Sequence, residues 1–144
     1  MKLPPSAPSS PVVETQVKVR YAETDAQRVV YHGAYVVWFE VGRTEFCERA
    51  GYPYPRMETE GVFITVVELR ARYRKAVRYG DTVTVRTRFG DFRSRGCTFL
   101  YEIALEDGST AAEGETTHLF LDAAGRPRPV PAGVRDAFAA FAAK

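Results

Sequence analysis

Apolar and polar residues alternate along five stretches of the chain, and a repeat of two residues is typical of a β-strand that buries one face. The first stretch places on one face Val13, Thr15, Val17, Val19 and Tyr21. The clearest alternation runs from Cys97 to Leu105, and the Asp107-Gly108 pair that follows it is a strong hairpin signal. The pattern predicts strands at about 13–21, 61–74, 83–89, 97–105 and 111–121.

A helical repeat follows the first predicted strand. Its apolar stripe consists of Tyr35, Phe39, Gly42 and Phe46. These spacings place all four on one side of a helix, and Gly51 followed by Pro53 provides a stop, so we predict one helix from Gly33 to Ala50. Because glycine costs about 1 kcal/mol relative to alanine inside a helix, Gly42 on this stripe predicts a close approach to a neighbouring sheet.

The remaining segments fix the order of the elements. Residues 52–60 contain two prolines and predict an irregular connection. A short closing helix is predicted by the helical spacing of Val134, Ala137, Phe138 and Phe141. One helix followed by four strands with short turns favours an antiparallel sheet over alternating βαβ units. We therefore expect an α+β domain in which an antiparallel β-sheet wraps around one long central helix.

Composition and charge narrow the class of protein. The 144 residues are 45% hydrophobic, which suits a single domain at 12–144 after a Pro/Ser-rich tail at 1–11 that we expect to be disordered. Twenty basic and 18 acidic residues are interleaved and give a net charge of +2, so no nucleic-acid partner is expected. No stretch approaches the roughly 20 apolar residues of a membrane span, so no membrane association is expected. Two cysteines, Cys47 and Cys97, are too few for a disulfide scaffold, and we expect a cytoplasmic protein.

Asp25 and His32 lie in the polar turn between the first strand and the long helix. A carboxylate and the free N–H groups of a helix start can converge there on one substrate atom, which suits acyl transfer. An aspartate before a helix is also a common turn or capping residue, and a single histidine is often structural. Residue type alone therefore leaves both interpretations open.

Several short motifs together resemble a known family. They are Thr24-Asp25, Val29-Val30-Tyr31-His32, Tyr35, Trp38-Phe39-Glu40, Arg43-Thr44-Glu45, Tyr73, Gly80-Asp81 and the closing Asp122, Gly125-Arg126-Pro127 and Pro131. In this combination the chain resembles hotdog-fold acyl-CoA thioesterases of the 4-hydroxybenzoyl-CoA thioesterase-like group. The resemblance implies hydrolysis of an acyl-CoA to a carboxylic acid and free CoA. It also implies dimers whose sheets join edge to edge, active sites at subunit interfaces and often a homotetramer.

The resemblance also assigns roles to residues of this chain. Asp25 matches the family's catalytic carboxylate, as base or nucleophile, and His32 would contribute chiefly its backbone N–H to an oxyanion site. Tyr31 and Thr65 would line the substrate pocket, and Arg93 and Arg95 would bind the CoA phosphates. Because coenzyme A is part of the substrate, no separate cofactor is expected, and no metal-ligand cluster is evident in the sequence.

Arg28 departs from the family pattern, which usually has glycine at this point of the turn. The arginine would either pair with Asp25 and keep it ionised or point to solvent. If it disabled Asp25, the chain would be a non-catalytic acyl-CoA-binding module. A hotdog dehydratase or hydratase that uses Glu40 or Glu45 is the other alternative.

The sequence also predicts association of the chain with itself. A sheet wrapped on one helix leaves edge strands uncovered, so we expect a homodimer or homotetramer. Leu100 and Leu119 lie out of phase with the buried residues of their strands, and we expect a second subunit to cover them. The identity of the acyl group stays open, because aromatic pocket residues would accept an aryl or a medium-length acyl group equally well.

Overall fold

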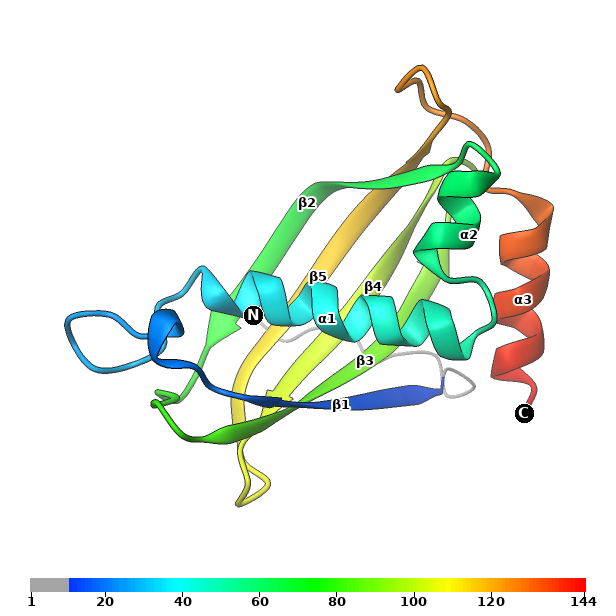
Figure 1. The fold of residues 1–144 in the computed structure, drawn as a ribbon. Helices are drawn as coiled ribbons and strands as arrows, with labels where there is room; N and C mark the ends of the chain where they lie inside the picture. The colour runs from blue at the N-terminus through cyan, green and yellow to red at the C-terminus, as the bar shows by residue number, and fades with distance from the viewer. Residues whose placement is uncertain (1–10) are drawn as a thin grey trace.

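The computed structural model describes residues 11–144 (Figure 1). The predicted tail therefore lies outside the described residues, except for Pro11. The elements in chain order are β1 Val12–Lys18, the 3-10 helix η1 Tyr21–Glu23, α1 Ala34–Arg49, α2 Tyr54–Thr59, β2 Phe63–Tyr73, β3 Thr82–Phe92, β4 Gly96–Ala104, β5 Thr110–Leu121 and α3 Ala132–Ala142.

One antiparallel sheet contains all five strands in the order β1-β3-β4-β5-β2. The predicted β4–β5 hairpin is confirmed: Gly108 adopts φ +86°, and its N–H donates to the Leu105 carbonyl at 2.9 Å. Strands β1 and β2 form the two edges of the sheet. The predicted α+β class and antiparallel sheet are therefore confirmed.

Helix α1 lies across one face of the sheet (Figure 1). It begins one residue after Gly33 and ends one residue before Ala50, close to the predicted bounds. The predicted apolar stripe is buried, and its three aromatic residues, Tyr35, Phe39 and Phe46, are each at most 3% exposed. Burial of this stripe against β3 and β1 holds the start of α1, and with it the polar turn, at one end of the sheet.

Helix α1 approaches the sheet closely at Gly42. A Cβ atom at this position would collide with Thr87 Oγ1 and Val85 Cγ1 of β3, which confirms the close approach predicted from the sequence. We expect Gly42→Ala to lower the free energy of unfolding by about 1–3 kcal/mol, because overpacking outweighs the gain in helix propensity. Thr44→Ala, at a half-exposed position of the same helix, is the control, with an expected change below about 0.5 kcal/mol. Urea denaturation measures both, and an unchanged midpoint for Gly42→Ala would contradict the packing argument.

Two segments differ from the sequence prediction. The connection predicted to be irregular contains helix α2, because Pro53 and Pro55 occupy the N-cap and first turn, where proline is well tolerated, and Met57 is buried beneath the helix. Tyr21, which was predicted to continue the buried face of the first strand, is 75% exposed. The chain leaves the sheet after Lys18 and turns into η1, so the alternation in the sequence extends past the strand itself.

Helix α3 confirms the predicted closing helix and covers one end of the core. Its Phe138 ring lies edge-on to Phe46 of α1 and to Phe89 of β3, with ring centroids 5.5 and 5.1 Å apart. Phe46 also packs edge-on against Phe99 of β4, at 5.6 Å. This aromatic cluster ties α1, α3 and the sheet together at the end of α1 that lies opposite the polar turn.

Apolar side chains stay exposed on edge strand β2 and on the outer side of α1. They are Phe63, Val66 and Val67 on β2 and Val36, Val37 and Val41 on α1, each 38–52% exposed. Apolar groups at an unpaired sheet edge are typical of an association surface. Leu100 is only 8% exposed in the single chain, so it does not need a second subunit to cover it, and Leu119 is half-buried. Across residues 11–144, no helix has the length and apolar character needed to cross a bilayer.

Candidate active site

The polar turn between η1 and α1 is anchored at both ends. The Tyr31 N–H donates to the Glu23 carbonyl at 3.0 Å, and the Val30 N–H donates to the Val77 carbonyl at 2.7 Å. Thr24 and Val30 form an isolated antiparallel bridge. The residues between them therefore form a closed loop, residues 25–29, that projects from a fixed base.

Asp25 opens this loop and is exposed to solvent. Its N–H donates to the Val29 carbonyl at 2.9 Å, and its Oδ1 accepts the Gln27 N–H at 2.8 Å. The residue therefore makes the Asx turn that residue type alone suggested. These bonds also fix the orientation of the carboxylate while engaging only one of its oxygens, so the turn role and a chemical role are compatible.

Arg28 adopts a left-handed conformation, with φ +65°. Within residues 11–144, no ion pair joins Arg28 to Asp25, and Arg28 is exposed. The family pattern predicted glycine here, and the loop adopts a backbone conformation that glycine favours. An arginine in this conformation has a steric cost that glycine would not have.

Substitution of Arg28 tests this backbone geometry. We expect Arg28→Gly to leave the free energy of unfolding unchanged or raise it by up to about 1 kcal/mol. Glycine removes the Cβ clash in the folded state, but it also makes the unfolded chain more flexible, which offsets part of the gain. Arg28→Val should lower it by more than about 1 kcal/mol, because a β-branched residue fits the left-handed region poorly. Thermal unfolding of both variants checks the order, and equal stability of the two would contradict it.

His32 lies two residues before α1, with its side chain exposed. Its carbonyl accepts the Tyr73 hydroxyl at 2.9 Å, which ties the helix start to the end of β2. The Ala34 N–H donates a hydrogen bond to the Tyr31 carbonyl at 3.1 Å. In the described part of the chain, the N–H groups of His32 and Gly33 have no hydrogen-bond partner, so they are available to an oxygen atom of a ligand.

A groove of about 330 Å³ brings Asp25 and His32 together. Its walls are formed by Asp25, Gln27, Val29, Val30, His32 and Tyr35 from the loop and α1, and by Tyr73, Arg74, Lys75 and Ala76 from the end of β2. Burial, and next the neighbouring Tyr73, raise the pKa of Tyr35 to about 12, and burial also raises the pKa of Tyr73. Both phenols are therefore protonated at neutral pH, and the groove combines a carboxylate, two phenol hydroxyls, a free backbone N–H and two cations.

Glu23 supports this site and was not identified from the sequence. Its side chain is buried, with Oε2 accepting the Trp38 Nε1–H at 2.8 Å and Oε1 accepting the Arg20 N–H at 2.9 Å. The carboxylate thus joins the base of the loop to α1. The sequence offered one indication of such a residue: Trp38 lies on the buried side of the helix, and a buried indole N–H needs a hydrogen-bond acceptor nearby.

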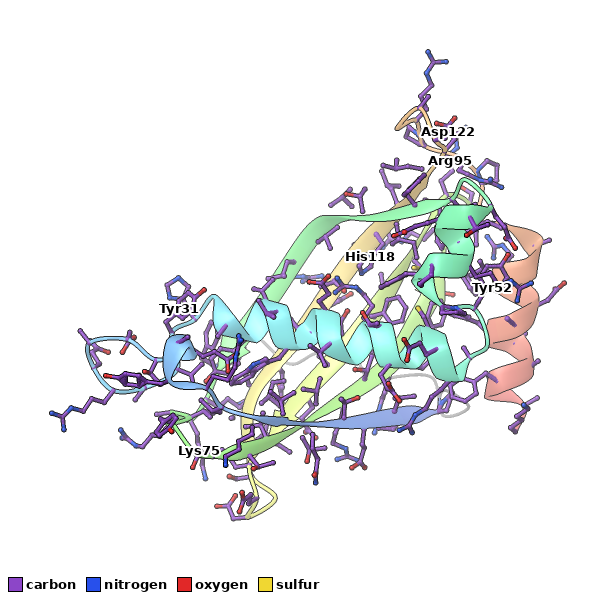
Figure 2. All side chains as sticks on the ribbon, in the orientation of Figure 1. Tyr31, Tyr52, Lys75, Arg95, His118 and Asp122 are labelled. Atoms are coloured by element: carbon purple, nitrogen blue, oxygen red, sulfur yellow. The ribbon has the colours of Figure 1, made fainter. Side chains whose placement is uncertain are left out.

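The other residues predicted for the site lie outside the groove of the single chain. Tyr31 is 42% exposed and lies next to His32, with ring centroids 6.0 Å apart. Thr65 is half-buried in the first half of β2. Arg93 and Arg95 are exposed in the β3–β4 turn, and Figure 2 shows Arg95 beside Asp122 at the opposite end of the molecule from Tyr31. Their roles in substrate binding therefore stay predictions, and within one chain the two arginines do not reach the Asp25 groove.

Comparison with known proteins identifies the class that this fold and groove define. Residues 19–138 match the thioesterase-like superfamily. The chain is 36% identical over 111 residues to YneP of Bacillus subtilis, a protein named as a candidate acyl-CoA thioesterase, covering 77% of this chain and 80% of that one. The chain belongs to the thioesterase-like superfamily, as its motifs predicted, and is a thioester hydrolase.

Two crystal structures share the fold at appreciable sequence identity. One is the hypothetical protein TT1821 from Thermus thermophilus, which is 43% identical in sequence with a TM-score of 0.84. The match covers 89% of this chain and 98% of the TT1821 chain. The other is the DHNA-CoA thioesterase from Staphylococcus aureus, which is 30% identical in sequence with a TM-score of 0.86. The match covers 92% of this chain and 91% of the S. aureus chain. The hotdog architecture predicted from the sequence is thereby confirmed.

Proposed function

We infer that this protein hydrolyses acyl-CoA thioesters and that Asp25 is its catalytic carboxylate. The observation that carries this assignment is the groove lined both by an oriented Asp25 and by His32, whose backbone N–H, like that of the next residue, has no partner in the described chain. The relatives support the substrate class, since one is a DHNA-CoA thioesterase and another is named for acyl-CoA. Release of free CoA thiol from an acyl-CoA is the experiment that tests it.

The geometry suits attack on a thioester carbonyl. Acting as a base, Asp25 takes a proton from water as the water oxygen bonds to the carbonyl carbon. Acting as a nucleophile, a carboxylate oxygen of Asp25 bonds to that carbon first, and water then cleaves the resulting anhydride. In both cases the C–S bond breaks and the CoA sulfur leaves and gains a proton. The N–H groups of His32 and Gly33 stabilise the negative charge that develops on the carbonyl oxygen.

A complete site needs a second copy of the chain. Edge strand β2 and the exposed apolar residues of α1 form the proposed dimer interface. An antiparallel pairing of β2 with its own copy about a two-fold axis puts the start of one strand beside the end of the other. Thr65 and the β3–β4 turn of the partner subunit then lie near Tyr73 at the Asp25 groove, which explains why Arg93 and Arg95 are far from it in one chain. A homotetramer and a cytoplasmic location stay predictions.

Removal of the two turn arginines tests the proposed phosphate contact. In Arg93→Ala/Arg95→Ala we expect KM for CoA thioesters to rise about tenfold or more with a smaller change in kcat, because phosphate contacts remote from the scissile bond contribute mostly uniform binding. A truncated thioester without the nucleotide is the matched substrate, and its KM should not change. Equal KM values for the CoA and truncated thioesters with the wild-type protein would argue against this site.

The two alternatives from the sequence are not favoured. The relatives are named as thioesterases, which argues against a non-catalytic binding module and against a dehydratase. The acidic residues considered for a dehydratase also lie outside the Asp25 groove: Glu40 is exposed midway along α1, and Glu45 pairs with Arg49 at 3.0 Å.

A further inference from the structure

The start of helix α1 is tied to the sheet by the side chain of Tyr73. Tyr73 is the last residue of β2, and its hydroxyl donates to the His32 carbonyl at 2.9 Å. His32 lies one residue before the N-cap Gly33, so its carbonyl lies outside the hydrogen-bond ladder of α1. The phenol is therefore the partner of a backbone group that the helix itself does not satisfy.

The peptide planes on both sides of His32 are held through their carbonyl oxygens. The Tyr31 carbonyl accepts the Ala34 N–H at 3.1 Å. The His32 carbonyl accepts the Tyr73 hydroxyl. Both peptide bonds are trans, and in a trans peptide the N–H points away from the C=O. Anchoring the two carbonyls therefore fixes the directions of the His32 and Gly33 N–H groups, the two donors assigned above to the thioester oxygen.

The peptide plane between His32 and Gly33 depends on the Tyr73 bond. Within residues 11–144 the N–H of this plane is unpaired, and Tyr73 is the hydrogen-bond partner of its carbonyl. Glycine has no Cβ to restrict its backbone, and a Cβ at Gly33 would collide with the Tyr31 ring. A carbonyl that accepts a hydrogen bond also polarises its own peptide group, which makes the Gly33 N–H a stronger donor.

Tyr73 is itself held by both the sheet and the helix. The N–H groups of Arg74 and Lys75 donate to the Ala111 carbonyl at 2.8 and 3.1 Å, which fixes the end of β2 to β5. The Tyr73 ring lies edge-on to the buried ring of Tyr35 on α1, with ring centroids 4.9 Å apart. The sheet and α1 together therefore determine where the phenol hydroxyl lies.

The Tyr73 phenol acts on the backbone rather than on the substrate. A phenol has one hydrogen to donate, and the His32 carbonyl accepts it. Burial raises the pKa of the Tyr73 phenol, so it stays protonated at neutral pH and does not serve as a general base. Its effect on catalysis passes through the backbone N–H groups that it orients.

We propose that Tyr73 is a positioning residue of the oxyanion site and holds the peptide between His32 and Gly33 so that the adjacent N–H groups meet the thioester oxygen in the transition state. This inference rests on the proposed function and adds to it a side chain from the end of β2. The Tyr73 hydroxyl then contributes to turnover and little to substrate binding, because negative charge develops on the thioester oxygen only as the transition state forms.

Tyr73→Phe removes the hydroxyl and keeps the ring that packs against Tyr35. We expect kcat to fall by about 10- to 100-fold with KM changed by less than about threefold, because misdirected donors affect the transition state more than the bound substrate. The Val30–Val77 backbone bond still holds the base of the loop, so the thermal midpoint should shift by less than about 5 °C. CoA release is measured with benzoyl-CoA or acetyl-CoA, whichever the wild-type protein hydrolyses faster. An unchanged kcat, or a rise in KM alone, overturns the inference.

Tyr52→Phe is the matched control. The Tyr52 hydroxyl donates to the Glu60 carboxylate at the end of α2, outside the Asp25 groove. This variant also loses a hydrogen bond from a tyrosine hydroxyl, and we expect its kcat to stay within about twofold of the wild-type value. Similar losses of kcat in Tyr52→Phe and Tyr73→Phe would show a general structural effect and would overturn the positioning role.

Infrared spectroscopy of the bound thioester reports on the N–H groups without turnover. The same thioester, labelled with ¹³C at its carbonyl, is bound to Asp25→Asn, in which the chemical step is expected to be lost. Hydrogen bonds polarise the carbonyl, so its stretching band should lie below the frequency in buffer. In Asp25→Asn/Tyr73→Phe the band should return at least about half of the way to the buffer frequency. Equal band positions in the two proteins contradict the inference, since a purely structural role of Tyr73 would not move this band.

Failure of the proposed function gives a different result. A wild-type protein that hydrolyses neither benzoyl-CoA nor acetyl-CoA refutes the proposed function, and this inference with it. A wild-type protein that hydrolyses one of them, with an unchanged kcat in a folded Tyr73→Phe protein, refutes only the role of Tyr73.

Discussion

Asp25→Asn is expected to lower kcat for acyl-CoA hydrolysis by about 10²- to 10⁴-fold with little change in stability. The amide oxygen can still accept the Gln27 N–H, so the Asx turn is kept. An amide cannot take a proton from water or attack a carbonyl carbon, so the chemical step is lost. Steady-state release of CoA thiol, together with thermal unfolding of the same preparation, measures both effects.

Asp122→Asn is the matched control for this substitution. Asp122 Oδ1 accepts the N–H groups of Ala124 and Arg126 at 2.9 and 3.0 Å, so it makes a similar turn outside the Asp25 groove of its own chain. Because Asp122 lies beside Arg95, the comparison is made on kcat, which phosphate contacts affect less than KM. We expect this variant to keep the wild-type kcat. An Asp25→Asn protein that is folded and fully active would refute the assignment of Asp25.

Val66→Lys is expected to separate the subunits and abolish activity together. Val66 is 43% exposed on edge strand β2, and an added charge at a strand edge opposes pairing with another strand. If the site is shared, turnover disappears with the dimer, because each groove then lacks the segments that the other subunit supplies. Light scattering beside activity across a dilution series measures the two quantities under the same conditions.

Ala139→Lys is the control, because Ala139 is exposed on α3, away from β2 and α1's apolar side. This protein should stay associated and active at every concentration at which the wild-type protein is. A Val66→Lys monomer with full activity would refute both the interface and the shared site.

The sequence predicted those parts of the fold in which a periodic pattern and a stop signal agree. Helix α1 lies within one residue of the predicted bounds at each end, because its stripe is buried and Gly51 ends it with φ +83°. The β4–β5 hairpin was equally clear, since Asp107-Gly108 suits a left-handed turn and Cys97 to Leu105 alternate without a break. Where burial and turn chemistry point to one structure, the pattern is sufficient.

Other features depend on contacts between distant segments and left no such pattern. Helix α2 is too short to show a repeat, and its prolines suggested a loop, although proline is compatible with a first helical turn. The exposure of Tyr21 follows from where the chain leaves the sheet, which alternation does not mark. The buried contacts of Glu23 and Arg43 run across 15 and 58 residues, to Trp38 and Tyr101, and nothing in the sequence pairs these positions.

Some residues of the candidate site could be predicted from the sequence pattern, and others could not. Asp25 and His32 are seven residues apart in the polar turn between η1 and α1, so their proximity followed from the strand-to-helix transition. Thr65, Arg93 and Arg95 were assigned by resemblance alone, and they lie outside the groove of the single chain. In the proposed dimer, symmetry rather than sequence distance brings these residues to the site, and the periodicity of one chain does not predict such an arrangement.

Thiol release from a panel of acyl-CoA thioesters by the intact wild-type protein tests the central claim most directly. A thiol reagent follows free CoA continuously, and calorimetric titration of the same thioesters with the Asp25→Asn protein measures binding without turnover. The account predicts catalytic release of CoA from at least one aryl- or short acyl-CoA by the wild-type protein, and binding with little release by Asp25→Asn. Binding of acyl-CoA by the wild-type protein without release of CoA would contradict it.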